Sequence, residues 1–319
     1  MSPSIPTTMK AAVIDKFGGP GVLHLAAIPV PEPGEREILV RVQAAGIGSW
    51  DPWIREGGMG SGPFPMVLGS DGAGTVVAVG AKVKRFKAGD KIYAYTFDNP
   101  KGGFYAEYAA VPEDAAAPIP GRLGMNEAGG LGACGLTALA AFDELEIARA
   151  MPLLVLGASG CVGHLALQLA KLKGARILAV ASGRDGVALA ERLGADRAVN
   201  GKNADVARAA REFAPEGLNA ALVFANSDKL AAALKQVKKG GTIGYPEGVE
   251  PAPRGPAGVK VHSFNGLPDP DAFARLNKLV AGGPFRVEIS RTYRLEDLPQ
   301  AHRDVLRHHV GKFVATPRA

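Results

Sequence analysis

The chain has few cysteines, and only Cys134 and Cys161 occur among its 319 residues. Two cysteines cannot form the disulfide framework of a small secreted domain, so we expect a reducing, cytoplasmic compartment. Long apolar runs are also missing, and no stretch reaches the roughly 20 residues that a membrane-spanning helix needs. Residues 1–8 lack the apolar core of a secretory signal, and we expect a loose leader before a first strand.

Tracts of a single charge are absent as well. Lysine and arginine number 37 against 31 aspartates and glutamates, which gives a formal net charge of +6, and the bases are spread along the chain. This distribution argues against nucleic acid as the main partner, while a modest positive field suits an anionic dinucleotide. With 47% hydrophobic and 21% charged residues, the chain is typical of a globular protein with one large or two moderate domains.

Glycine, in contrast, is abundant, and three of the 42 glycines form the most informative pattern. The apolar run 153–156 ends at Gly157, and Gly160 and Gly163 follow before a leucine-rich helical pattern. In a strand–turn–helix, such glycines let the backbone approach a pyrophosphate, which the helix N-terminus attracts. The GxxGxxG spacing is less specific than GxGxxG, but a second apolar strand at 175–181 completes a βαβ unit. The alternative is a glycine-rich turn in some other α/β protein.

The first part of the chain is predicted to be mainly β. Short β-branched segments with Gly/Pro punctuation occur between residue 9 and about residue 120, and a small barrel would accommodate them. The strands expected here are 9–14, 38–42, 74–80 and 91–95.

From about residue 121 the pattern changes to alternating helices and strands, which predicts an α/β fold with a parallel sheet covered on both faces. The expected helices are 126–146, 185–193, 205–213, 229–238, 271–281 and one from 295 onward. The further strands are 198–199, 220–224, 241–245 and 287–293. Within Lys239-Gly240-Gly241 we expect a glycine to end the helix 229–238 at its C′ position.

The end of the second predicted strand of the parallel sheet indicates which coenzyme is bound. Proteins that bind NAD place Asp or Glu there for the ribose 2′-hydroxyl. Here the strand ends in Ala181-Ser182-Gly183-Arg184, and a guanidinium pairs well with a 2′-phosphate. We therefore expect NADPH rather than NAD. Two alternatives are that Asp185 turns back to serve NAD, or that Arg184 is a solvated residue paired with Asp185.

At this point the chain resembles a known family. Over residues 9–318 it is similar to the zinc-free quinone oxidoreductase (zeta-crystallin-like) branch of the medium-chain dehydrogenase/reductase superfamily. Each matching segment is short, and the strength of the resemblance lies in their order along the chain. These segments are 9–11, 46–51, 69–76, 86–90, 102–108, 135–138, 157–163, 193–196 and Gly311-Lys312.

The resemblance implies a two-domain enzyme. A GroES-like β-rich catalytic domain would comprise residues 1–120 and 266–319, and a Rossmann dinucleotide-binding domain residues 121–265, with the active site in the cleft between them. NADPH would reduce a quinone or an α,β-unsaturated carbonyl, and the family is commonly a homodimer. The alternatives are an alcohol dehydrogenase-like enzyme without zinc, and a nucleotide-binding regulatory protein with little turnover.

The resemblance also assigns site residues. Thr137 would contact the nicotinamide, and Asp51 and Trp53 would line the catalytic site; the simpler roles are a helix hydroxyl for Thr137, a helix cap for Asp51 and core packing for Trp53. Cys161 is either part of the pyrophosphate turn or a small packing residue. The expected coenzyme-binding residues are Gly157, Ser159, Gly160, Cys161, Val162, Ser182, Arg184, Thr137, Tyr245 and Phe264.

The same resemblance predicts that no metal is bound. Catalytic zinc in the sister alcohol dehydrogenases takes a Cys, a His-Glu pair and a further ligand. Here the first position lies in Gly46-Ile47-Gly48, and the second reads Ser70-Asp71. The chain also departs from its own branch, because Gly48, Trp53 and Gly201 stand where Asn, Tyr and Tyr are usual.

Overall fold

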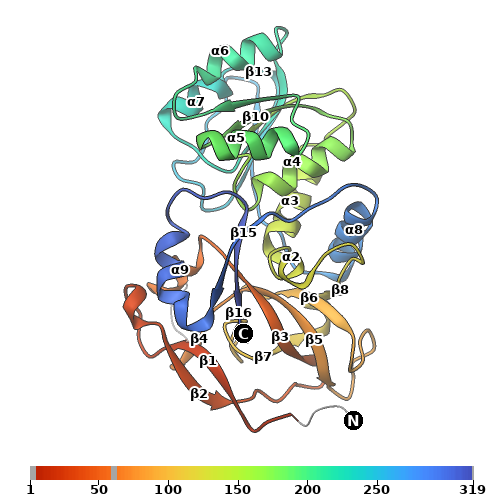
Figure 1. Ribbon diagram of the computed structural model, residues 1–319. Helices are drawn as coiled ribbons and strands as arrows, with labels where there is room; N and C mark the ends of the chain where they lie inside the picture. The colour runs from red at the N-terminus through yellow and green to blue at the C-terminus, as the bar shows by residue number, and fades with distance from the viewer. Residues whose placement is uncertain (1–4, 59–62, 318–319) are drawn as a thin grey trace.

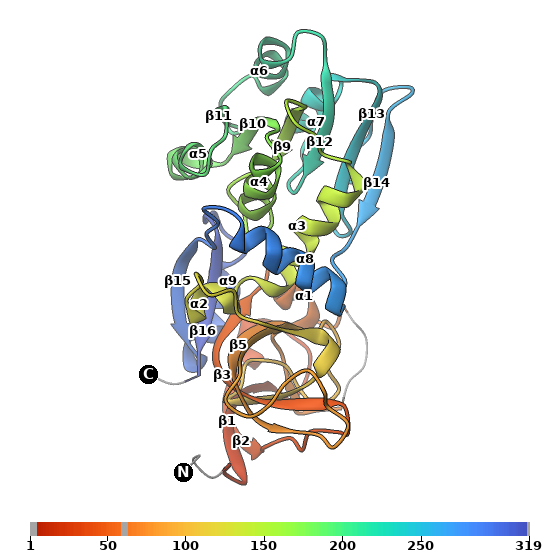
Figure 2. The same cartoon turned by 90° about the vertical axis from the view of Figure 1, so that its right-hand side faces the viewer.

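The computed structural model describes residues 5–58 and 63–317. A region built on a parallel sheet lies at one end of an elongated molecule, and a β-rich region that holds the described residues nearest both termini lies at the other (Figures 1 and 2). Residues 1–4 of the expected leader lie outside the described ranges. The first strand already begins at Thr8.

The parallel sheet has the strand order β11-β10-β9-β12-β13-β14, and every neighbouring pair is parallel. Counted from β9, this is the order 3-2-1-4-5-6 of dinucleotide-binding folds. The fold class predicted for this half is therefore confirmed. Its strands are β9 (Pro152–Leu156), β10 (Arg176–Ala181), β11 (Arg197–Asn200), β12 (Leu218–Val223), β13 (Val237–Pro246) and β14 (Lys260–Phe264).

Helices cover both faces of this sheet. Leu153 and Val155 of β9 belong to one buried core, and Leu154 and Leu156 belong to the core on the opposite face. A strand that is apolar on both sides reads as a continuous hydrophobic run, which is why 153–156 stood out in the sequence. The helices are α3 (Gly132–Glu144), α4 (Gly163–Leu172), α5 (Gly183–Arg192), α6 (Val206–Phe213) and α7 (Asp228–Leu234).

The helix expected over 229–238 is present but ends earlier, and the C′ glycine expected near Gly240 is wrong. Helix α7 ends at Leu234, and β13 begins at Val237, which pairs with Leu218. The N–H of Leu218 also donates to the carbonyl of Gln236 at 2.8 Å. Sheet pairing therefore outweighs the helical propensity of the lysines within 235–239. Gly240, with φ of +82°, lies in an irregularity of β13.

The single helix expected over 126–146 is two helices, α2 (Met125–Gly129) and α3. The break lies at Gly130, where an added Cβ would be 2.9 Å from Cγ of Lys312. The missing side chain at Gly130 therefore makes room for Lys312, which reaches this point from a distant strand.

The β-rich region consists of two sheets. The larger has the order β15-β16-β3-β5-β6-β8, with β7 also paired to β3, and the smaller has the order β2-β1-β4. The strands are β1 (Thr8–Ile14), β2 (His24–Pro29), β3 (Glu37–Ile47), β4 (Met66–Val67), β5 (Asp71–Val79), β6 (Lys91–Tyr95), β7 (Tyr108–Pro112), β8 (Ala116–Pro118), β15 (Ile289–Arg294) and β16 (Lys312–Thr316). The remaining helices are α1 (Asp51–Arg55), α8 (Pro270–Ala281) and α9 (Leu298–Asp304), with short 3₁₀ turns at Pro20–Val22, Glu113–Ala115 and Leu295–Asp297.

Strand register brings distant residues to one end of the larger sheet. Phe313 pairs with Ile47, and Gly46 pairs with Asp71. Lys312, next to Phe313, therefore lies beside the end of β3 and the start of β5. In both views this end of the sheet faces the parallel-sheet region.

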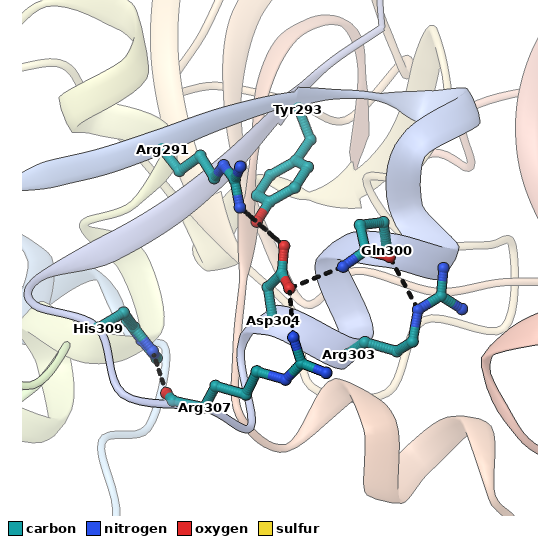
Figure 3. Close-up of polar contacts among 7 residues, drawn as sticks. All are labelled: Arg291, Tyr293, Gln300, Arg303, Asp304, Arg307 and His309. Atoms are coloured by element: carbon teal, nitrogen blue, oxygen red, sulfur yellow. Dashed lines mark hydrogen bonds and ion pairs between the residues drawn. The ribbon is translucent and has the colours of Figure 1, made fainter.

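The chain returns to the β-rich region through β15 and α9, and one carboxylate holds these elements together (Figure 3). Asp304 accepts from Arg291 at 2.8 Å, from Tyr293 at 2.9 Å and from Gln300 at 2.7 Å. Arg307 lies 3.8 Å from the same carboxylate. These contacts fix the turn that follows α9.

In the described ranges, no helix has both the length and the apolar character needed to cross a membrane.

The α8 helix is expected to depend on Phe273. This side chain is fully buried, and its ring packs edge-on against Tyr93 at 5.3 Å between centroids. Phe273→Ala should lower the free energy of unfolding by about 3–5 kcal/mol, measured by urea unfolding. Leu306→Ala, at a residue 64% exposed, is the control and should change it by no more than about 0.5 kcal/mol. Equal effects of the two variants would contradict this packing.

Candidate coenzyme and catalytic site

The glycine turn between β9 and α4 has the geometry of a site for a phosphorylated ligand. Gly157 has φ of +78°, and its N–H donates to the carbonyl of Val180 at 2.9 Å. A Cβ at Gly163 would lie 2.1 Å from the Gly157 carbonyl oxygen, so the turn can close only with glycine at that position. An added Cβ at Gly160 would make only an ordinary contact, 3.4 Å from the Gly157 carbonyl oxygen. The turn is thus closed against its own strand at Gly163, as a close backbone approach to a pyrophosphate requires.

Two segments of the β-rich part hold this turn. Gly311 donates its N–H to the carbonyl of Ser159 at 2.7 Å. His164, fully buried on α4, lies 2.9 Å from the Gly160 carbonyl through Nδ1, and its Nε2 accepts from the N–H of Glu288 at 3.1 Å. Burial lowers the pKa of His164 to about 4, so the ring is neutral and these two contacts define its tautomer.

The end of β10 has no unpaired carboxylate. Gly183 has φ of +74° and Arg184 is exposed. Asp185 lies 3.0 Å from His308 Nε2, and this hydrogen bond lowers the pKa of Asp185. His308 lies in the turn after α9, where the N–H of Arg307 donates to the carbonyl of Asp304 at 2.9 Å. Asp185, the residue that could have served NAD, is therefore paired across the junction of the two regions, whereas Arg184 is not paired with it.

A buried ion pair lies where the two regions meet. Lys312 Nζ is 3.2 Å from Asp71 Oδ2, and both side chains are at most 1% exposed. Burial alone would lower the pKa of Lys312, but the acidic groups around the ammonium, Asp71 foremost, together outweigh burial and raise this pKa. The backbone N–H of Ala133 at the start of α3 also acts to lower the pKa of Asp71. Burial raises the pKa of Asp71 while Lys312 opposes that shift; the short contact supports an ionic pair.

Both cysteines lie next to this pair. Lys312 Nζ is 3.6 Å from the sulfur of Cys134, and the thiols of Cys134 and Cys161 interact with each other. This interaction lowers the pKa of Cys161 and raises the pKa of Cys134. The coenzyme turn is thus connected to the Asp71–Lys312 pair through two side-chain contacts.

Asp51 is fully buried, and one of its oxygens accepts two hydrogen bonds. Oδ2 accepts from Tyr105 OH at 2.6 Å and from the N–H of Gly48 at 2.7 Å, while Oδ1 has no partner among the described residues. Burial raises the pKa of Asp51 to about 6, although both hydrogen bonds act in the opposite direction.

The remaining predicted residues lie in several places. Thr137 Oγ1 accepts from the N–H of Gly266 at 3.3 Å, so it joins α3 to the chain beyond β14. Trp53 is 51% exposed and packs on Gly58. Tyr245 lies on β13 beside the core on one face of the parallel sheet, and Phe264 belongs to the core on the other face. The coenzyme turn and Asp51 occupy buried, well-connected positions, whereas Trp53 lies at the surface.

Four residues around the site were not assigned from the sequence: Trp50, Tyr105, His308 and Lys312. Trp50 donates to Ser70 Oγ at 3.1 Å, and Lys312 Nζ lies 4.6 Å from the centroid of its ring. Three of them lie in matching segments, Trp50 in 46–51, Tyr105 in 102–108 and Lys312 in Gly311-Lys312, but their membership assigned them no role. Across the residues that the structure describes, His, Cys, Asp and Glu form no group of three or more suited to a metal ion.

Comparison with known proteins agrees with this architecture. Residues 34–121 match the family model described as "Alcohol dehydrogenase GroES-like domain", and residues 161–256 match "Zinc-binding dehydrogenase". Quinone oxidoreductase of Mus musculus is 31% identical over 95% of this chain and 96% of its own length. The chloroplastic NADPH-dependent alkenal/one oxidoreductase of Arabidopsis thaliana is 36% identical over 75% of this chain and 63% of its own length.

Solved structures give the same result. An NAD-dependent alcohol dehydrogenase superimposes with a TM-score of 0.88 and 30% identity, covering 97% of this chain and 99% of its own. A mycobacterial protein solved in complex with NADPH superimposes with a TM-score of 0.84 and 26% identity, covering 97% of this chain and all of its own. Similarity therefore extends over the whole length of these proteins.

Loss of one partner of the buried ion pair should be costly. Lys312→Met leaves Asp71 as an uncompensated buried carboxylate, and we expect the free energy of unfolding to fall by about 3–5 kcal/mol. The double variant Asp71→Asn/Lys312→Met removes both charges and should recover at least half of that loss. Urea unfolding of the three proteins measures this, and a double variant no better than Lys312→Met would refute the ionic coupling.

The raised pKa of Asp51 predicts a dependence of stability on pH. Because the folded state holds this proton up to about pH 6, against an ordinary pKa of 3.8, Asp51 lowers stability as pH rises through this interval. The loss in the free energy of unfolding should reach about 3 kcal/mol and should not grow further above about pH 6. Asp51→Asn keeps an acceptor for Tyr105 and Gly48, so its stability relative to the unmodified protein should increase from pH 4 to pH 6.5. A pH-independent difference in urea unfolding would contradict this.

Proposed function

Because this chain belongs to the zeta-crystallin-like quinone oxidoreductase branch of the medium-chain dehydrogenase/reductase superfamily, we propose that it uses NADPH to reduce a quinone or an α,β-unsaturated carbonyl. It is an oxidoreductase with a nicotinamide coenzyme. The observation that carries the choice of NADPH is the end of β10, where Arg184 is exposed and Asp185 is paired with His308.

The residues present fit a phosphorylated dinucleotide. The turn formed by Gly157, Ser159, Gly160, Cys161 and Val162 offers backbone groups with room for phosphate oxygens outside it. Ser182 and Arg184 lie at the end of the next strand, where they would bind the 2′-phosphate. Thr137, Tyr245 and Phe264 would contact the nicotinamide half. When bound, the coenzyme supplies the hydride, and the chain supplies binding and orientation.

Asp51 orients the catalytic side of this site. Its two short hydrogen bonds fix the Tyr105 ring and the backbone at Gly48. With a pKa of about 6, its carboxyl group can also hold a proton at the start of the neutral range, close to the region where an enolate or hydroquinone would need one. Thr137 would line the same site from α3, and Trp53 would line it from the surface of α1.

The proposal includes a homodimer in the cytoplasm. β14 is an edge strand of the parallel sheet, and the first four of its five residues are exposed. An exposed edge offers backbone groups that a second copy can pair with. Sedimentation at micromolar concentration tests this part independently of catalysis.

The experiment that tests the function is NADPH oxidation over a panel of quinones and enones, with an alcohol plus NAD⁺ or NADP⁺ as the competing reaction. We expect turnover of at least one quinone or enone and no alcohol oxidation. The structural similarity to an NAD-dependent alcohol dehydrogenase makes the alcohol assay the appropriate comparison. Coenzyme binding without turnover would favour a regulatory role instead.

Arg184→Ala should separate the two coenzymes. Loss of a charge-assisted contact to the 2′-phosphate should raise KM for NADPH about tenfold and leave KM for NADH within about twofold. Arg208→Ala is the matched control, because Arg208 is an exposed arginine on α6 that pairs with Glu212 on the same helix. An unchanged KM for NADPH in the Arg184 variant would overturn the assignment of this residue.

A further inference from the structure

The Trp50 indole occupies the space between two positions that resemble metal-ligand positions of the sister alcohol dehydrogenases. Its Nε1 donates to Ser70 Oγ at 3.1 Å, and its six-membered ring covers Gly48. A Cβ at Gly48 would lie 2.3 Å from Trp50 Cε2, so the indole can lie there only if residue 48 is glycine. Gly48 therefore leaves the volume that the Trp50 indole fills, and Ser70 supplies the oxygen that accepts its hydrogen bond.

Buried charge stabilises one face of the same ring. Lys312 Nζ lies 4.6 Å from the ring centroid and 3.2 Å from Asp71. A cation at this distance from an aromatic face is attracted by the ring quadrupole. Because Ser70 holds the N–H and Lys312 holds one face, the indole has a fixed orientation.

The fixed ring lies at the junction of the two regions. Trp50 packs against the core of the parallel sheet and against the core of the β-rich part, and it remains partly exposed. Contacts from Cys161 to Cys134, from Cys134 to Lys312 and from Lys312 to Trp50 connect it to the coenzyme turn. A partly exposed aromatic side chain thus lies a few side-chain contacts from the place where the coenzyme would bind.

We propose that Trp50 is the surface against which the ring of the acceptor lies, and that it makes the site prefer flat cyclic acceptors, the quinones, over linear enals. This inference rests on the proposed function and narrows its substrate class. An offset-stacked ring gains from contact with an indole, whereas a flexible linear enal presents no comparable face. Ser70 is a positioning residue here, because it acts through the orientation of the indole.

Steady-state kinetics with two acceptors tests the proposal. Tetramethyl-1,4-benzoquinone is the cyclic probe, since its substituted ring carbons make it slow to add to the thiols, and trans-2-hexenal is the linear probe. Trp50→Leu should raise KM for the quinone about three- to tenfold and change KM for hexenal less than twofold. Trp50→Phe keeps a ring and should retain most of the preference. Ser70→Ala should raise KM for the quinone by a smaller factor than Trp50→Leu, with kcat unchanged.

A substitution at Gly48 gives an independent check. Gly48→Ala must displace the indole, so it should reduce the quinone preference as Trp50→Leu does. The double variant Gly48→Ala/Trp50→Leu should keep at least the quinone preference of the weaker single variant, because either change alone already displaces or removes the ring. Additive losses would show that Gly48 acts separately and would overturn the shared role.

Fluorescence provides a readout that needs no turnover. The chain has two tryptophans, Trp50 and Trp53, so Trp53→Phe leaves Trp50 as the only indole. The quinone should quench this variant saturably, with a midpoint near its KM. Trp50→Leu, which leaves the exposed Trp53 and weakens quinone binding, should show only the linear quenching of free N-acetyltryptophanamide.

The outcomes separate the two proposals. If the unmodified protein oxidises NADPH with neither acceptor, the proposed function fails. If it turns over both acceptors but Trp50→Leu affects them equally, or Trp53→Leu changes their ratio in its place, the assignment of Trp50 fails and the proposed function stands. Saturable quenching of Trp53 but not of Trp50 also overturns the assignment.

Discussion

The Asp71–Lys312 ion pair constrains both halves of the molecule at once. Both side chains are buried, and the charges can remain buried only because each lies 3.2 Å from the other. Asp71 comes from the start of β5 and Lys312 from the start of β16. A glycine at position 46 is needed as well, because a Cβ there would lie 2.5 Å from the Asp71 carboxylate. Gly130, between α2 and α3, leaves room for the Lys312 side chain in the same way.

This constraint explains why the coenzyme turn is held by residues that are distant in sequence. Once Lys312 is fixed, Gly311 beside it is placed to donate to Ser159, and His308, three residues before Gly311, reaches Asp185 at 3.0 Å. Glu288 contacts His164 from the neighbouring segment. Both the turn 157–163 and the end of β10 are therefore held by the last part of the chain, so that the shape of this turn and the packing between the two regions are coupled.

Sequence reasoning succeeded where a signal is local. The run 153–156 and the glycines after it identified β9, the turn and α4, because a doubly buried strand and a close backbone approach each restrict the residues allowed. It failed at 235–240, where the pairing of Val237 with Leu218 ends the helix early. It also failed at 130, where the expected helix is interrupted at a glycine that packs against Lys312. The roles proposed for Trp53, Thr137 and Arg184 stay predictions, as do the domain boundaries at 120 and 265.

The roles of Gly48 and Trp50 show why residue-by-residue comparison was insufficient. Taken alone, Gly48 is a lost polar group and Trp50 has no assigned role. In the structure the two are one feature, because the indole occupies the volume that any side chain at 48 would need. Its N–H then bonds to Ser70 and its face lies over Lys312. A loss of polarity at one position is thus accompanied by an oriented aromatic ring at another, and this relation depends on side-chain volume and direction rather than on sequence spacing.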